Sequence, residues 1–263
     1  MRNDLFTFAP LGDSVVLIRL VRSSYTTNTR KTKMKLCVIM PAYNEASVIA
    51  DVIRQIPKKI MDINNVEVIV VNDNSTDNTS RVAKEAGAVV LNHRLNLGAG
   101  GATMTGLEYA RRNNFDVAVT MDSDGQHDPS EIKKLVKRVL SGYDLVIGSR
   151  LLGSQRHGMP LIKWIGNNAF NVITFLFYGV WVTDSQSGFK AFSKKAMEKC
   201  QVESVGYEIC SALIGKAKAE HLRICEEPIK IIYTDYSKRK GQHYLNGFNI
   251  VIRLALSKIR GSL

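Results

Sequence analysis

Short apolar runs and longer segments of helical periodicity alternate along the chain from residue 34 onwards. Runs rich in β-branched residues predict strands at residues 36–40, 66–71, 88–92, 116–121 and 144–149. Apolar positions at helical spacing predict helices between them, at residues 45–55, 76–86, 98–113 and 130–140. This alternation is typical of an α/β fold, in which helices cover both faces of a mostly parallel sheet.

The second half of the chain continues with mixed elements. The patterns predict a loop at 151–160, helices at 194–199 and 208–219, and strands at 187–192, 222–227 and 229–234. A basic run at 237–243 precedes an amphipathic helix expected at 245–259. Basic amphipathic helices fit a membrane surface or the groove of a partner protein.

Residues 161–182 are strongly apolar and aromatic, but Lys163 and three asparagines interrupt them. That composition is too polar for a membrane-spanning helix. Two interpretations stay open: a helix at a membrane interface, with its aromatic side chains at headgroup depth, and a buried core helix.

The first 33 residues hold only one short apolar patch, at 15–21, followed by a polar and basic stretch. They are expected to form a flexible extension. Met34 immediately precedes the first clear strand, so we expect one folded domain over residues 34–263.

Polar residues cluster just after three of the predicted strands, at 41–45, 72–77 and 122–126. In parallel sheets the ligand lies beyond the carboxyl ends of the strands, so these loops are expected to converge on one crevice. Asp122, Asp124 and Gln126 stand at alternate positions after the strand at 116–121. Their oxygen atoms suit Mg²⁺ or Mn²⁺ shared with substrate phosphates, although an ordinary Asp-rich turn is the alternative.

The glycine-rich stretch NLGAGGATMTG does not fit a dinucleotide-binding motif, because Thr103 stands where the third glycine is needed. A glycine-rich helix start at Gly98 still lets the backbone approach a phosphate. Close packing of the helix on the sheet explains the glycines equally well. Arg150, which ends another strand, is either a phosphate-binding fork or a solvated arginine.

The chain has 263 residues and a net charge of +12, which favours polyanionic partners: nucleic acid, nucleotide diphosphates or an anionic membrane surface. Its four cysteines form no C-x-x-C pair, so we expect reduced thiols and neither zinc sites nor disulfides. The sequence shows no secretory signal and no long apolar run, and we therefore expect a cytoplasmic protein at the membrane face.

Six motifs in order carry a family resemblance: PAYNEA, VNDNSTDNT, NLGAGGA, DSDGQHDP, GSR and DSQSGFKAF. Together they resemble family 2 glycosyltransferases of the GT-A fold, and among these the polyprenyl-phosphate or dolichyl-phosphate mannose and glucose synthases. The resemblance covers about residues 34–242. It implies a nucleotide-sugar half at about 34–150, an acceptor half at about 151–263, and inverting, metal-dependent transfer of mannose or glucose from GDP-mannose or UDP-glucose to a lipid phosphate.

The resemblance also assigns roles to residues of this sequence. Catalysis would involve Asp122, Arg150 and Lys163. The nucleotide sugar would be bound by Pro41, Tyr43, Glu45, Val71, Asp73, Gly98, Asp122, Ser123 and Asp124. The acceptor phosphate would be bound by Arg150, Lys238, Arg239 and Lys240, and Mg²⁺ or Mn²⁺ by Asp124 and Gln126. Departures from the family pattern include Asn72, which replaces a common aspartate, and Lys163, which replaces a common arginine. The segment GYEIC near Glu208 also lacks a second acidic residue.

Two other functions stay open. A transferase of the same fold that acts on a saccharide hydroxyl needs a general base, for which Glu208 is the candidate. A nucleic-acid-binding module fits the positive charge, but the sequence contains no helix-turn-helix or RNA-binding signature. We therefore expect nucleotide sugar, lipid phosphate and membrane contact, and no nucleic acid, as partners.

Overall fold

The computed structural model describes residues 6–11, 14–19, 34–61, 63, 65–152, 159, 161–202 and 209–232. The chain divides into two compact units, Met1–Thr32 and Lys33–Leu263, and each is described by itself. In the first unit, strands β1 (Phe6–Leu11) and β2 (Ser14–Arg19) pair antiparallel. The sequence patterns predicted no strand there, but the apolar patch that begins at Val15 is β-branched and lies largely in β2.

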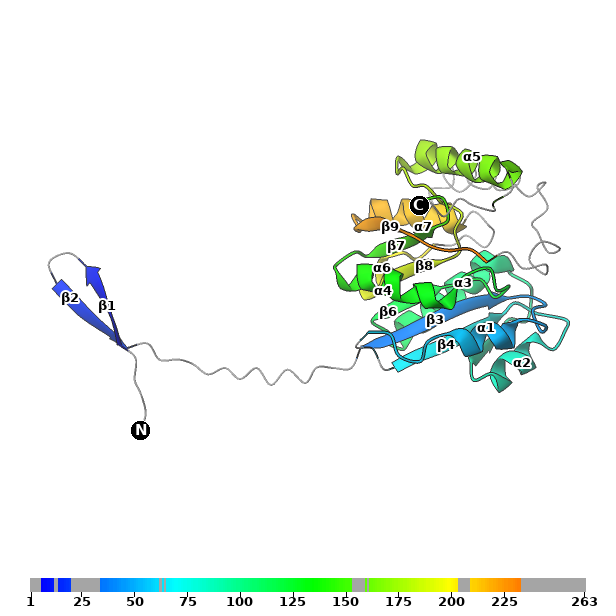
Figure 1. Ribbon diagram of the computed structural model, residues 1–263, viewed down its shortest axis with the longest axis horizontal. Coiled ribbons are helices and arrows are strands. Elements are labelled where there is room, and N and C mark those ends of the chain that lie inside the picture. The colour runs from blue at the N-terminus through cyan, green and yellow to red at the C-terminus, as the bar shows by residue number, and fades with distance from the viewer. Residues whose placement is uncertain are drawn as a thin grey trace. The chain divides into compact units, whose positions relative to one another are not determined.

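The second unit is a single α/β domain built on a seven-stranded sheet of order β5-β4-β3-β6-β8-β7-β9 (Figure 1). Strand β8 runs antiparallel to β6 and β7, and the other neighbours pair in parallel. The prediction of a mostly parallel sheet is thus confirmed. The strands are β3 (Lys35–Ala42), β4 (Asn65–Asn72), β5 (Val89–Asn92), β6 (Val117–Thr120), β7 (Leu145–Ser149), β8 (Lys190–Ser193) and β9 (Ile224–Pro228).

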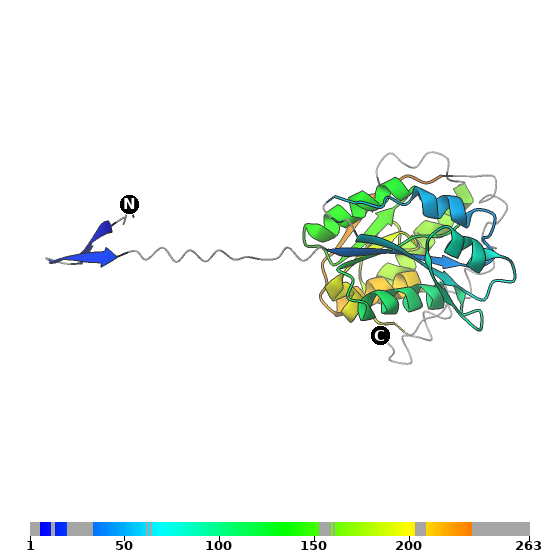
Figure 2. The same ribbon diagram turned by 90° about the horizontal axis from the view of Figure 1, so that it is seen from below.

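Helices cover both faces of this sheet (Figure 2). Strand β3 shows how the sequence builds the two layers: Leu36, Val38 and Met40 pack with α1, α2 and α4, whereas Cys37 and Ile39 pack with α3, α6 and α7. Alternate residues of a strand point to opposite faces, so an uninterrupted apolar run serves both cores. The helices are α1 (Ile49–Gln55), α2 (Thr79–Glu85), α3 (Gly98–Arg112), α4 (Ile132–Leu140), α5 (Leu161–Tyr178), α6 (Lys194–Lys199) and α7 (Ile209–Ala219).

Helices α1 and α2 begin later than the sequence predicted, because the residues before them are held in turns. Asn44 has a φ of 55°, and its Oδ1 accepts a 2.8 Å hydrogen bond from the Thr76 N–H, so neither loop is helical there. The second difference concerns residues 229–234. Over 229–232, the described part, the predicted strand is absent and Ile231 forms only an isolated bridge with His127.

Other predicted features lie outside the described residues. They include most of the loop at 151–160, the basic run at 237–243 and the helix expected at 245–259.

Candidate active site

Three loops at the carboxyl ends of β3, β4 and β6 are hydrogen-bonded to one another, as their polar clusters predicted. The Glu45 N–H donates to Thr79 Oγ1 at 2.8 Å, which joins the loops after β3 and β4. Ser123 Oγ donates to the Pro41 carbonyl at 2.8 Å, which joins the loops after β6 and β3. Pro41, Glu45 and Ser123 therefore lie together at one edge of the sheet. Tyr43 is 44% exposed on the same edge, whereas Val71 is completely buried within β4.

Asp73 caps the start of α3. Its carboxylate accepts hydrogen bonds from the N–H groups of Leu97 at 2.8 Å and Gly98 at 2.7 Å, and it contacts His93 Nδ1 at 2.8 Å. The backbone N–H of Gly98, which we expected near a donor phosphate, thus bonds within the chain. Farther along the same helix, a Cβ at Gly106 would lie 2.2 Å from Ile39 Cγ2. Close packing of α3 on the sheet explains that glycine, and the donor-binding roles of Asp73 and Gly98 stay predictions.

Asp122 stands just beyond β6, with 52% of its side-chain surface exposed. His127 Nε2 lies 3.0 Å from its Oδ2, and the His127 ring is buried against Phe189, with ring centroids 5.0 Å apart. On the other side, a Cβ placed on Gly188 would lie 2.5 Å from Asp122 Oδ1. The histidine and the bare glycine backbone together fix where this carboxylate sits.

The pKa values of Asp122 and Asp124 shift in opposite directions. Packing around the Asp122 carboxyl acts to raise its pKa even though half of the side chain is exposed. The hydrogen bond and charge of His127 oppose that effect, and with the charges of Arg150 and Lys190 they hold the pKa below its usual value. Burial, followed by the negative charge of Asp122, raises the pKa of Asp124.

This loop fits a divalent cation. The Asp124 side chain accepts hydrogen bonds from the backbone and side-chain N–H groups of Gln126, so the two predicted ligands are in contact. A cation would offset both the burial of the Asp124 carboxylate and its repulsion by Asp122, the two causes that raise the pKa of Asp124. Within the described ranges no group of three or more His, Cys, Asp or Glu side chains could hold a metal. Diphosphate oxygens and water would complete the coordination shell, as is usual for Mg²⁺.

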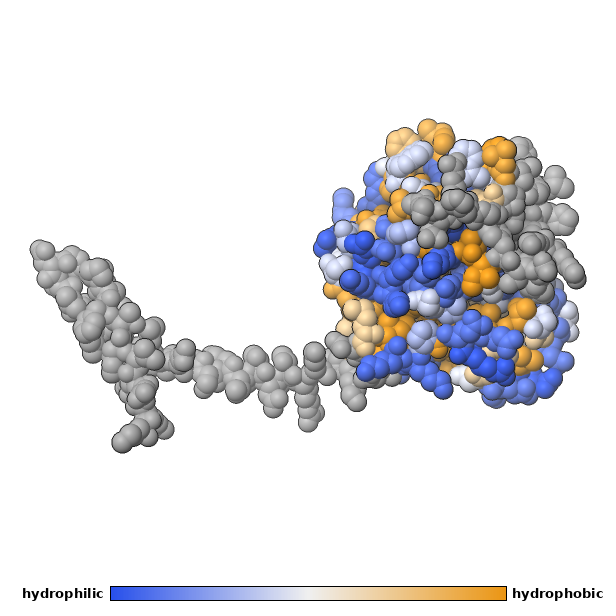
Figure 3. All heavy atoms as spheres, viewed as in Figure 1, coloured by the Kyte–Doolittle hydropathy of each residue, from blue (hydrophilic) through white to orange (hydrophobic). Residues whose placement is uncertain are grey.

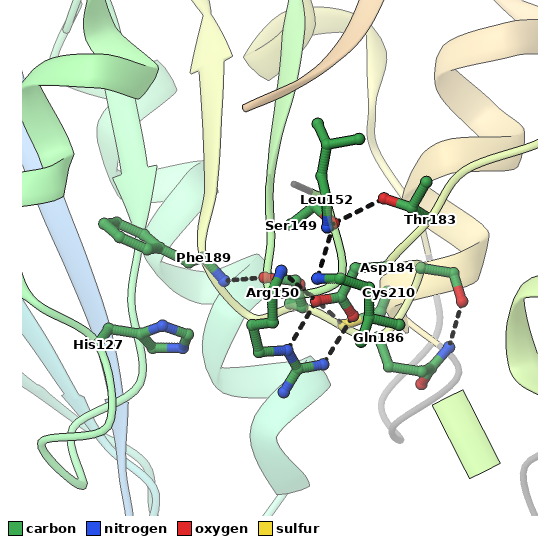
Figure 4. Close-up of polar contacts among 12 residues, drawn as sticks. His127, Ser149, Arg150, Leu152, Thr183, Asp184, Gln186, Phe189 and Cys210 are labelled. Carbon is green, nitrogen blue, oxygen red and sulfur yellow. Dashed lines mark hydrogen bonds and ion pairs between the residues drawn. The ribbon is translucent and has the colours of Figure 1, made fainter. Parts of the chain in front are cut away.

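Arg150 forms a two-pronged ion pair with a buried carboxylate (Figure 4). Its Nε and Nη2 donate to Asp184 Oδ2 and Oδ1, each at 2.7 Å, and its backbone N–H also donates to Oδ2 at 2.9 Å. Asp184 is completely buried, which acts to raise its pKa. The charge and the hydrogen bonds of Arg150, with the charge of Lys190, together outweigh that effect and hold the pKa of Asp184 below its usual value. The guanidinium fork that we expected on a phosphate is directed at Asp184, and a phosphate contact by Arg150 stays a prediction.

The loop that carries Asp184 is held by residues distant in sequence. Glu226 on β9 accepts hydrogen bonds from Thr183 N–H, Thr183 Oγ1 and Asp184 N–H, at 2.8–3.2 Å. Asn171 on α5 donates to the Thr183 carbonyl at 2.6 Å and accepts from the Ser185 N–H at 2.8 Å. The bonds to the Glu226 carboxylate are charge-assisted, and such bonds are short and directional. The position of Arg150 therefore depends on β9 and α5.

The sequence prediction missed the positioning residues His127, Asp184 and Gly188. Each stands in a motif that the sequence displays, His127 in DSDGQHDP and the other two in DSQSGFKAF. The acidic residue that opens DSQSGFKAF was the available signal for a partner of Arg150. Five other predicted functional groups lie outside the described residues, namely the side chain of Lys163 and residues Glu208, Lys238, Arg239 and Lys240.

Replacing Gly188 by alanine is expected to displace the Asp122 carboxylate and to lower the reaction rate at this candidate active site by about tenfold to a hundredfold. The free energy of unfolding should change little, because the half-exposed carboxylate can move toward solvent. Gly166→Ala is the matched control, since nothing lies within 4 Å of a Cβ there. Steady-state kinetics and urea unfolding of both variants check this. Equal rates in the two variants would mean that the carboxylate position is not critical.

Some related proteins match this chain over most of their own length. An uncharacterized protein of Methanocaldococcus jannaschii is 42% identical over 231 residues, 86% of this chain and 93% of that one. A UDP-N-acetylglucosamine–dolichyl-phosphate N-acetylglucosaminyltransferase of Methanococcus voltae is 38% identical over 243 residues, 84% of this chain and 95% of that one. A polyprenol monophosphomannose synthase of Mycolicibacterium smegmatis is 27% identical, covering 89% and 91% of the two chains.

The fold is also shared with a solved structure, the glucosyl-3-phosphoglycerate synthase of Mycobacterium tuberculosis in complex with Mn²⁺, uridine diphosphate and phosphoglyceric acid. It superposes with a TM-score of 0.65 at 22% identity, covering 85% of this chain and 78% of that one. The model of the family named Glycosyl transferase family 2 matches residues 37–200, more than half of the sequence. The chain therefore belongs to glycosyl transferase family 2 and is a glycosyltransferase.

Proposed function

We propose that the enzyme moves a hexose from a nucleotide diphosphate sugar to a polyprenyl or dolichyl phosphate, with inversion at the anomeric carbon. The observation that carries this proposal is the 38% identity, over nearly the whole of both chains, with a relative named as a dolichyl-phosphate transferase. Relatives named as polyprenol and dolichol phosphate mannosyltransferases, at 27% and 30% identity, support the same class of acceptor.

The chemistry of the site fits an acceptor that is already an anion. A sugar hydroxyl must lose a proton as it attacks, so its transferase needs a general base with a suitable pKa. The lowered pKa of Asp122 makes that carboxylate a weak base near neutral pH. A lipid phosphate needs only to be placed in line behind the anomeric carbon, with its charge balanced by basic residues.

Asp124 and Gln126 would hold Mg²⁺ or Mn²⁺ in this proposal. The cation would supply electrostatic stabilisation of the departing nucleoside diphosphate. Asp122, fixed by His127 and Gly188, would orient the donor sugar. Arg150, fixed by Asp184, would present its positive charge to a phosphate at the end of β7. Ser123 would hold the loop against β3 through its bond to the Pro41 carbonyl.

The donor sugar is the finer part of the proposal. The sequence resemblance predicted mannose or glucose, whereas the 38% identical relative is named for N-acetylglucosamine. We therefore add UDP-N-acetylglucosamine to GDP-mannose and UDP-glucose as candidate donors. Thermal shift with Mn²⁺ and each nucleotide sugar should single out one donor, because a ligand that binds only the folded state stabilises it.

The proposed acceptor is tested by transfer of labelled sugar from each donor, with Mn²⁺, to a polyprenyl phosphate and to saccharides. The Glu208→Gln variant is assayed in parallel, because a hydroxyl acceptor would require a base. We expect label in the lipid phosphate and a modest effect of Glu208→Gln. Label only in saccharide, with a large loss of rate in the variant, would instead establish the alternative transferase.

A further inference from the structure

The exposed side of α5 is apolar. A helix on the surface of a water-soluble domain normally exposes polar side chains and buries apolar ones. Among the positions of α5 whose side chains the structure describes, the exposed ones are all apolar: Leu161, Ile165, Ala169, Val172, Phe175 and Leu176. These six define the apolar face of α5. At 3.6 residues per turn they fall within about a third of the helix circumference.

The inner side of α5 is polar where it is most deeply buried. Among the α5 side chains that the structure describes, the buried ones are Asn171 and Thr174, and both are hydrogen-bonded. Asn171 binds the loop next to Asp184, and Thr174 Oγ1 contacts Ser211 Oγ on α7 at 2.8 Å. The orientation of the helix is thus set by polar bonds to the domain. The apolar face of α5 points outward because these bonds hold the opposite side inward.

Aromatic residues extend the apolar face at the end of the helix. Trp181 is exposed, and its ring packs edge-on against Phe175, with centroids 5.8 Å apart. Beside them Lys218, also exposed, donates from Nζ to the Gly179 carbonyl at 2.7 Å. Orange apolar side chains are visible at the top of the domain in Figure 3, where Figure 1 labels α5. Exposed aromatic and aliphatic side chains next to a lysine are typical of surfaces that meet lipid headgroups.

We propose that the apolar face of α5, with Trp181, docks the enzyme on an anionic lipid membrane. The proposal rests on the proposed function, since a polyprenyl phosphate acceptor resides in such a membrane. Within the described residues no helix is long and apolar enough to cross a bilayer. The helix would therefore lie flat, with its apolar side chains about 5–10 Å deep at the headgroup boundary. The net charge of +12 complements an anionic surface.

Docking in this orientation would bring the active site to the acceptor. Asn171 bonds both Thr183 and Ser185, the neighbours of Asp184, and Asp184 holds Arg150. Helix α5 is thus hydrogen-bonded to the loop of Asp184, and Asp184 in turn is paired with Arg150 at the end of β7. An acceptor phosphate at headgroup level would then lie on the same side of the domain as Arg150.

The chain provides its own reporter for this contact. Its two tryptophans, Trp164 and Trp181, lie in α5 and just after it, so intrinsic tryptophan emission reports on this region alone. We would mix the full-length protein, without donor or acceptor, with vesicles of phosphatidylcholine and of phosphatidylcholine plus phosphatidylglycerol. We expect a blue shift with the anionic vesicles, quenching by brominated lipid, and weaker binding at high salt. The Trp164→Phe variant should still show the blue shift and the quenching, because Trp181 remains.

Two substitutions test the face directly. Leu176→Gln and Ile165→Gln should each lower vesicle partitioning by about tenfold, because each loses the burial of a large aliphatic side chain in lipid. Leu95→Gln is the matched control, since Leu95 and Leu176 are both 70% exposed and Leu95 lies outside α5. Thermal unfolding should be nearly unchanged in all three variants, because the side chains are exposed. Absence of a shift in the wild type, or equal losses in Leu95→Gln and Leu176→Gln, would overturn the proposal.

Transfer assays separate this proposal from the proposed function. With a short-chain, water-soluble prenyl phosphate, Leu176→Gln should turn over at the wild-type rate, whereas with acceptor in vesicles it should be slowed about tenfold. Transfer without any vesicle binding would refute docking and leave the proposed function standing. Vesicle binding that depends on the α5 face, without transfer to any prenyl phosphate, would refute the function alone. If sedimentation shows a dimer that Leu176→Gln dissociates, the face binds a second copy and the docking proposal is wrong.

Discussion

Arg150→Met is expected to lower the free energy of unfolding at neutral pH by about 3–5 kcal/mol, the usual effect of removing one partner from a buried ion pair. Asp184 is completely buried and both of its oxygens bind Arg150, so the variant would leave a carboxylate without its counter-charge. Urea unfolding of the wild type and the variant measures the difference. Adding Asp184→Asn to Arg150→Met should recover much of the loss, because the amide keeps an acceptor and removes the charge.

The same pair predicts how stability depends on pH. In the wild type the folded-state pKa of Asp184 lies below its unfolded value of about 3.9. Its stabilising contribution is therefore complete above that value and is lost as the pH falls through the folded pKa. In Arg150→Met, burial acts without the arginine, so the folded-state pKa of Asp184 should rise above its unfolded value. Acidification should therefore narrow the difference in free energy of unfolding between the variant and the wild type. A gap that stays constant with pH, or a double variant as unstable as Arg150→Met, would contradict this account of the pair.

Asp124→Asn is expected to reduce sugar transfer by about a hundredfold or more, the scale found when one preorganised electrostatic group is removed from an active site. The substitution keeps the Oδ1 acceptor for the Gln126 N–H and removes one negative charge from the proposed metal site. Without metal, the variant should be as stable as the wild type or slightly more so. The reason is that burial and, after it, the negative charge of Asp122 disfavour the ionised form of Asp124 and raise its pKa.

The matched control for this variant is Asp128→Asn in the same loop. Asp128, not Asp124, caps the 3₁₀ helix Pro129–Glu131, by accepting from the Ser130 N–H at 2.9 Å. Unfolding of both variants and the wild type is measured in EDTA and in excess Mn²⁺. Mn²⁺ should stabilise the wild type and Asp128→Asn, and Asp124→Asn much less. Equal Mn²⁺ responses in all three proteins, with undiminished transfer by Asp124→Asn, would exclude Asp124 as a metal ligand.

Local patterns predicted most of the domain's elements because a buried parallel strand is an apolar run and its covering helix is amphipathic. The place and direction of β8 in the sheet could not be predicted from local patterns. This strand lies between β6 and β7 and runs antiparallel to both, yet it follows them in sequence. Its pairing depends on contacts about 45 to 75 residues away, which no local period encodes. The late start of α1 has the same kind of cause, a bond from Asn44 to the next loop.

Some residues of the candidate site could likewise be predicted from local sequence, and others could not. Asp122, Asp124 and Gln126 lie close together in sequence, so their grouping at a strand end was predictable. The partners that fix the site were harder to find. Asp184 is 34 residues from Arg150, and Gly188 matters only because its missing side chain leaves space for Asp122. The sequence also left α5 open between a core helix and an interfacial one. Its exposed apolar positions favour the interfacial interpretation.

The most direct test of the proposed reaction is the linkage of its product. Wild-type enzyme with Mn²⁺, a polyprenyl phosphate and each of the three nucleotide sugars is allowed to react, and the glycolipid is analysed by ¹H and ³¹P NMR. All three donors carry the sugar in the α configuration. Direct attack by the acceptor phosphate predicts a β-linked sugar on a phosphate oxygen, formed with Mn²⁺ and not with EDTA. A retained α linkage, a sugar on a hydroxyl group, or undiminished formation in EDTA would contradict it.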